Sequence, residues 1–104
     1  MRFTRRLHPE AAEELVEAIR HYEERAGAGE DFASKARAAA LDIIDSPDAW
    51  PPAPYWAGPP TVRRRKIGVY PYRVVYYRRG SEVVIIAYAH EKRRPGYWRS
   101  RISD

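Results

Sequence analysis

The residues best suited to chemistry lie in the last third of the chain. Arg64, Lys66 and Arg73 are cations within strand-forming segments, and His90 and Tyr97 follow them. Cleavage of RNA by its ribose 2′-hydroxyl needs cations around the phosphate and groups that accept and donate protons. Arginine binds phosphate oxygens in pairs, while histidine titrates near neutral pH. The pattern predicts a phosphate-handling site with Arg73, His90 and Tyr97 as catalytic residues.

A second group of cations is expected to bind RNA phosphate or an acidic protein partner. Its members are Arg64, Lys66, Lys92, Arg93 and Arg94. Each candidate residue also has an ordinary structural explanation, such as the solvated face of a strand, a surface ion pair or an anchor for the tail. These explanations are the more frequent ones for single residues, whereas convergence on one face of a sheet would favour a functional site.

The charges are divided unevenly along the chain. Residues 1–60 carry seven Lys/Arg and eleven Asp/Glu, a net charge of −4, whereas residues 61–104 carry twelve and three, a net charge of +9. A cationic half indicates an anionic partner that docks on one face, although charge that only maintains solubility explains the same numbers.

Length and composition restrict the class of protein. A chain of 104 residues is expected to form a single domain, residues 1–104, with one modest core. Cysteine is absent and no set of carboxylates has ligand spacing, so we expect neither a metal nor a cofactor. The N-terminus lacks the apolar run of a signal peptide, and the longest apolar run, residues 83–89, is too short for a membrane span. A cytoplasmic location without a membrane partner is expected.

Two stretches of the first half predict a helical hairpin. The first helix begins at Pro9 and ends at the glycines around residue 27. Its predicted apolar stripe consists of Ala12, Leu15, Val16, Ile19, Tyr22 and Ala26. The second helix is expected over residues 31–45. Many alanines on its apolar side permit close approach to the first helix.

Strands are predicted on either side of the hairpin. They cover residues 2–7, 61–67, 72–78 and 82–90, with a proline-rich loop over residues 47–60. In the second strand Val62, Arg64 and Lys66 share one face by alternation. The order β-α-α-β-β-β predicts an α+β domain in which the helical hairpin packs on a mostly antiparallel sheet.

Several segments together resemble toxins of the RelE/ParE superfamily from bacterial type II toxin–antitoxin modules. They are residues 8–11 (HPEA), 62–63 (VR), 70–76 (YPYRVVY) and 90–98 (HEKRRPGYW). The resemblance implies a compact sheet with two helices packed on one side. It also implies a cognate antitoxin, encoded next to the toxin, that wraps a segment over the active surface. The cationic half of the chain is a natural target for an acidic segment of that kind.

The superfamily contains two mechanisms. RelE-like members are ribosome-dependent, metal-independent mRNA endoribonucleases that use basic residues and a C-terminal tyrosine. The residues at the matching places are Arg64, Lys66 and Arg73 on the strands, Lys92 or Arg93 at a later arginine, and Tyr97 or Trp98 at the tyrosine.

ParE-like members instead inhibit DNA gyrase by protein binding and need no catalytic set. They are similar in the helical hairpin and in the His-x-x-Arg-Arg ending of residues 90–94. The cationic strands, His90 and Tyr97 favour a ribonuclease acting on ribosome-bound mRNA. The alternatives are a gyrase inhibitor, or a relic that only binds its antitoxin.

Overall fold

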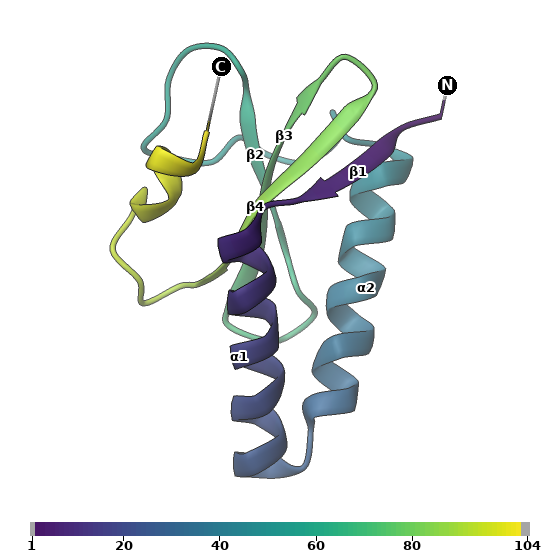
Figure 1. The fold of residues 1–104 in the computed structure, drawn as a ribbon, viewed down its shortest axis with the longest axis vertical. Coiled ribbons are helices and arrows are strands. Elements are labelled where there is room, and N and C mark those ends of the chain that lie inside the picture. Colours follow the sequence, from purple (N-terminus) through teal and green to yellow (C-terminus); the bar gives the residue numbers. More distant parts are fainter. Residues whose placement is uncertain (1, 103–104) are drawn as a thin grey trace.

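The computed structural model describes residues 2–102, and its elements follow the predicted order. These are β1 (Thr4–Leu7), α1 (Pro9–Ala26), α2 (Gly29–Asp45), β2 (Val62–Lys66), β3 (Tyr72–Arg79), β4 (Glu82–His90) and a short 3-10 helix, η1 (Tyr97–Arg101). Figure 1 shows α1 and α2 as a hairpin beside the sheet. The predicted α+β fold class is confirmed.

The four strands form one mixed sheet in the order β1-β4-β3-β2. Only the β1–β4 pair is parallel, and the other two pairs are antiparallel. A two-residue turn at Gly80 and Ser81 joins β3 to β4, and Gly80 supplies the positive φ of 61° that such a turn requires. The predicted strands are correct within two residues at their ends. The first begins at Thr4 instead of residue 2, and Phe3 packs against the core.

Helix α1 begins and ends where the sequence predicts. The N-cap is His8, whose Nδ1 accepts a hydrogen bond of 3.1 Å from the Glu10 N–H, and the C-cap Gly27 has a left-handed φ of 63°. The predicted apolar stripe is partly wrong. The buried residues of α1 are Ala11 and Ala18, whereas Val16 is 53% exposed. Leu15, Ile19 and Tyr22 of the predicted stripe do pack against the core, so the face against the sheet overlaps the predicted one but is displaced toward Ala11 and Ala18.

Helix α2 begins at Gly29, two residues earlier than predicted. The Gly29 N–H donates to Glu23 Oε1 at 3.1 Å, and a Cβ at Gly29 would lie only 2.9 Å from the Cβ of Glu23. Glycine is needed here because the two helices meet almost directly after the turn. The buried alanines Ala36, Ala39 and Ala40 give α2 the smooth packing face that the sequence predicts.

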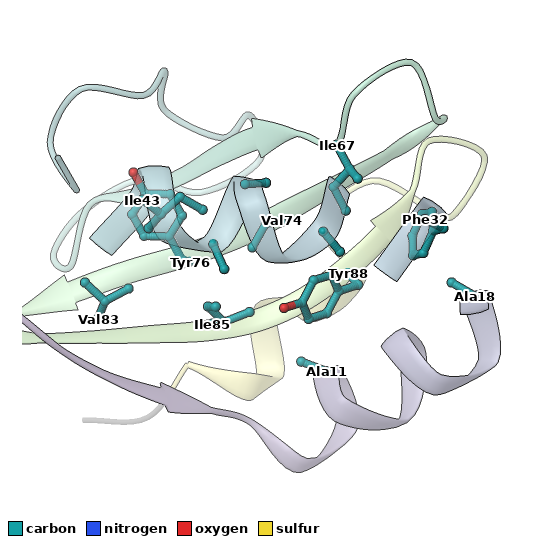
Figure 2. Close-up of a cluster of buried hydrophobic side chains, with 13 residues drawn as sticks. Ala11, Ala18, Phe32, Ile43, Ile67, Val74, Tyr76, Val83, Ile85 and Tyr88 are labelled. Atoms are coloured by element: carbon teal, nitrogen blue, oxygen red, sulfur yellow. The ribbon is translucent and has the colours of Figure 1, made fainter. Parts of the chain in front are cut away.

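The sheet is buried on both faces. Figure 2 shows the core between the sheet and the helices, which includes Phe32, Ile43, Val74, Tyr76 and Ile85. A second core lies on the opposite face and contains Ala53, Val62, Val75, Tyr77, Val84, Ile86, Ala87 and Trp98. Strand β4 is buried from Val83 to Tyr88, as expected for a central strand covered on both faces.

The second core is covered by irregular segments instead of helices. The proline-rich loop contributes Ala53 and Trp56, and η1 contributes Trp98. Within the loop, the Trp56 indole N–H donates to the Pro60 carbonyl at 2.7 Å. Figure 1 shows η1 beside this loop, on the side of the sheet away from α2. None of the helices within residues 2–102 is long and apolar enough to span a membrane.

We predict that Trp98→Ala lowers the free energy of unfolding by about 3–5 kcal/mol, because a large indole is removed from the second core. Trp98 is 5% exposed. Urea unfolding followed by circular dichroism measures the change. Val69→Ala is the control, because Val69 is 93% exposed and its loss should cost less than about 0.5 kcal/mol. Equal effects of the two substitutions would mean that the second core contributes little stability.

Candidate functional site

A cavity of about 110 Å³ opens on the sheet face opposite the helices. Arg64 of β2 and Arg73 of β3 line it together with Tyr55 of the proline-rich loop and Trp98 of η1. Val75, Ala53 and Trp98 belong to the second core and also line the cavity, so the cavity lies directly next to that core. It is the place at which two predicted site residues from neighbouring strands meet.

The strand register explains why both arginines reach this cavity. Arg64 lies opposite Val75, and Lys66 lies opposite Arg73. Arg64, Arg73 and Val75 therefore share one face, because alternate residues of a strand point to the same side. The predicted alternation of β2 is confirmed, since Val62 packs in the second core while Arg65 pairs with Asp42 of α2 on the helix side.

The two arginines give the cavity an incompletely neutralised positive charge. The guanidinium of Arg64 makes no hydrogen bond or ion pair within residues 2–102, and burial, with Arg73 beside it, lowers the pKa of Arg64. The nearest carboxylate oxygen to Arg73 is Glu91 Oε2, 3.8 Å from Nη1, which is too long for a hydrogen bond. A pair of neighbouring guanidinium groups favours an anion.

His90 lies at the boundary between this cavity and a second one beside α1. Its ring packs edge-on against Tyr72, with ring centroids 4.9 Å apart, and Tyr72 belongs to the helix-side core. Its Nδ1 accepts a hydrogen bond of 3.0 Å from the Lys92 N–H. The structure therefore does not bring the His90 ring onto the face that carries Arg64 and Arg73.

Tyr97 also lines the cavity, but its hydroxyl is bonded to another side chain. The O–H donates to Glu14 Oε2 at 2.7 Å, and the guanidinium carbon of Arg93 lies 3.9 Å from the centroid of the ring. Burial and the bond to Glu14 raise the pKa of Tyr97. The phenol is thus held in its protonated form as a donor to a carboxylate.

Glu14 is the centre of this contact and receives further donors. Arg101 binds it in a bidentate manner, with Nη1–Oε1 and Nη2–Oε2 distances of 2.9 and 3.0 Å. The Tyr88 N–H of β4 donates to Oε1 at 3.1 Å. The Glu14 side chain is only 15% exposed. One carboxylate therefore joins α1, β4 and η1, and charge-assisted bonds of this kind are among the stronger ones in proteins.

The remaining predicted cations are more dispersed. Arg93 and Arg94 line the rim of the cavity, whereas Lys66 and Lys92 do not line it. The Lys66 Nζ donates instead to the Tyr70 carbonyl at 2.6 Å. No group of three or more histidine, aspartate or glutamate side chains in the described part of the chain could hold a metal ion.

The sequence reasoning overlooked Glu14, Arg101 and Tyr55. Glu14 lies three residues after Ala11 and four before Ala18, on the buried face of α1, but the predicted stripe did not include these alanines and so did not mark it. Arg101 carries no local signal. Tyr55 is 61% exposed and has a left-handed φ of 71°, a backbone state that its sequence context does not indicate.

Comparisons with known proteins agree with the fold. A solved structure described as the chromosomal ParDE toxin–antitoxin system from P. aeruginosa matches with a TM-score of 0.60 and 18% identity. The match covers 85% of this chain and 95% of the other, and at this identity it shows a shared fold. No match was found among curated proteins. The family described as the ParE toxin of the type II toxin–antitoxin system parDE matches residues 5–95. This chain therefore belongs to the ParE toxin family, within the RelE/ParE superfamily that its sequence resembles.

Proposed function

We propose that this type II toxin acts by binding DNA gyrase instead of cleaving mRNA, and that its cognate antitoxin neutralises it. The observation that carries the proposal is the hydrogen bond from the Tyr97 hydroxyl to Glu14. It occupies the group that the sequence predicts as the C-terminal acid or base of a nuclease. Gyrase inhibition is the ParE-type activity, and it needs a complementary surface without a catalytic set.

A nuclease needs a proton-transfer group beside the cations that hold the phosphate. Such a group works best when its pKa lies near the working pH. The pKa of Tyr97 is raised instead, because the phenol is buried and donates to a carboxylate. The His90 ring packs on Tyr72 at the helix side of the sheet. His90 and Tyr97 line the same cavity as the two arginines, but the phenol is bonded to Glu14 and the imidazole packs on Tyr72, so neither group is directed at a phosphate between the arginines.

Ribosome-dependent cleavage remains the second candidate because Arg64 and Arg73 line one cavity. Two adjacent guanidinium groups suit a phosphate chemically. If RNA enters this cavity, the scissile phosphate lies between the two arginines, and the proton acceptor comes from the RNA, the ribosome or a rearranged Tyr97.

The deciding experiment tests the toxin on purified DNA gyrase, on purified programmed ribosomes and in growing cells. We expect the toxin to inhibit supercoiling by bacterial DNA gyrase and to leave mRNA on programmed ribosomes intact. After induction in cells without antitoxin, thymidine incorporation should fall before amino-acid incorporation. If amino-acid incorporation falls first and ribosome-bound mRNA is cleaved, the proposal is wrong and the toxin is a ribonuclease.

A substitution at Tyr97 separates the two mechanisms within one protein. We predict that Tyr97→Phe retains growth inhibition, because the hydroxyl serves only Glu14. The lost bond to a charged group should lower the free energy of unfolding by about 1.5–3 kcal/mol. Growth arrest after induction and urea unfolding are the two measurements.

Glu14→Gln is the matched variant for this test, because it disrupts the same contact from the other side. Under the binding mechanism both variants are destabilised and both remain toxic. A folded Tyr97→Phe protein that has lost toxicity, beside a toxic Glu14→Gln protein, would contradict the proposal and identify Tyr97 as a catalytic residue.

A further inference from the structure

We propose that the cavity between Arg64 and Arg73 is a carboxylate pocket that receives one acidic side chain of the antitoxin. The proposal rests on the protein-binding function proposed above and adds the chemical group that is recognised. Four arginines line the cavity or its rim, namely Arg64, Arg73, Arg93 and Arg94, against the single carboxylate of Glu91.

The unpaired state of Arg64 is the first argument. Its guanidinium has no ion-pair or hydrogen-bond partner in the chain from residue 2 to residue 102. The side chain is partly buried but its nitrogens still reach water, so a carboxylate can replace that water without displacing a protein partner. Arg73 does not compensate, since it carries the same charge. A carboxylate entering the cavity would satisfy Arg64 with paired N–H···O bonds, the geometry in which arginine binds carboxylates best.

The size and walls of the cavity favour a side chain over a nucleotide. Its volume of about 110 Å³ is well below the roughly 300–1,000 Å³ of sites for whole small ligands. Ala53, Val75 and Trp98 form apolar walls beside the two arginines. Apolar walls with a cationic end match the methylene groups and the carboxylate of glutamate or aspartate.

The rim of the cavity is held in a strained conformation. Tyr55 has a φ of 71° and exposes 61% of its surface at the mouth. A bulky residue rarely adopts this backbone state, and such strain persists where the surrounding structure imposes it. A Cβ on Gly96 would lie 3.2 Å from the Tyr55 Cβ, so glycine lets the two rim segments approach. The exposed ring is available to pack against a docked segment.

Charge complementarity selects the antitoxin as the source of the carboxylate. Residues 61–104, which supply both arginines, carry a net charge of +9 from twelve Lys/Arg and three Asp/Glu. A solved structure that shares this fold is described as a toxin–antitoxin system. An acidic segment is attracted to such a surface before contact, and a seated carboxylate then slows its dissociation.

The first experiment tests the pocket in the isolated toxin. The probes are N-acetylglutamate, inorganic phosphate and a short single-stranded RNA, and the readout is the arginine Nε–H signals in NMR spectra. We expect N-acetylglutamate to shift the Arg64 and Arg73 signals in a saturable manner and to bind more tightly than the other probes. Arg64→Gln should weaken it at least tenfold, and Arg20→Gln, which removes a surface arginine of α1, should not.

Two outcomes of this titration would overturn the proposal. Tighter binding of phosphate or RNA in the pocket would assign it to nucleic acid. Unchanged Arg64 and Arg73 signals with every probe would show that the cavity is not an anion site. Thermal unfolding checks that Arg64→Gln is folded, and Arg73→Gln provides a second variant if it is not.

The second experiment tests the partner. We expect Arg64→Gln to speed dissociation of the antitoxin by about 30-fold or more, as when one member of a buried charge pair is truncated. An unchanged dissociation rate would mean that the antitoxin does not use the pocket. Both experiments measure binding to the toxin directly. Their failure is therefore distinct from a failure to inhibit gyrase.

Discussion

Burial of the sheet on both faces is the constraint on which the rest of the structure depends. Strand β4 is buried from Val83 to Tyr88, but both helices lie against only one face. The other face must therefore be covered by the proline-rich loop and η1. This irregular cover does not extend past Val75. Next to Val75, the side chains of Arg64 and Arg73 lie on the same face of the sheet and line the cavity. The cationic cavity is the uncovered end of the second core.

Glu14 is what holds this cover in place. Its donors come from β4 and η1 while its own backbone belongs to α1, so one carboxylate links the helix layer to the segment that carries Trp98. Breaking such a partly buried pair from one side is costly, because the remaining charge is left without its partner. This contact also engages the hydroxyl of Tyr97. Tyr97, which with Trp98 is one of the two residues that the resemblance puts at the place of the nuclease tyrosine, donates its hydroxyl hydrogen to Glu14.

Local patterns predicted most of the elements correctly. The two-residue alternation of β2 separated Arg64 from Arg65, and the structure places them on opposite faces. The stripe of α1 was less well predicted, since Val16 is exposed and Glu14 lies between the buried alanines Ala11 and Ala18. Small alanines and a glutamate carry a weak hydrophobic signal. The periodicity of α1 therefore placed Leu15, Ile19 and Tyr22 against the core but did not show that Ala11 and Ala18 are its most buried residues.

The sequence by itself determined the order of the elements, the charge division, the family resemblance and the shared face of Val62, Arg64 and Lys66 within one strand. These properties depend on neighbours along the chain or on motifs in order. Only the tertiary structure decided that Tyr97 and Arg101 meet Glu14, across 83 and 87 residues of sequence. It also decided that Arg64 is unpaired and that the His90 ring turns to the helix side. The reason is that these contacts depend on how separate elements pack together, and no periodicity within one element specifies that packing.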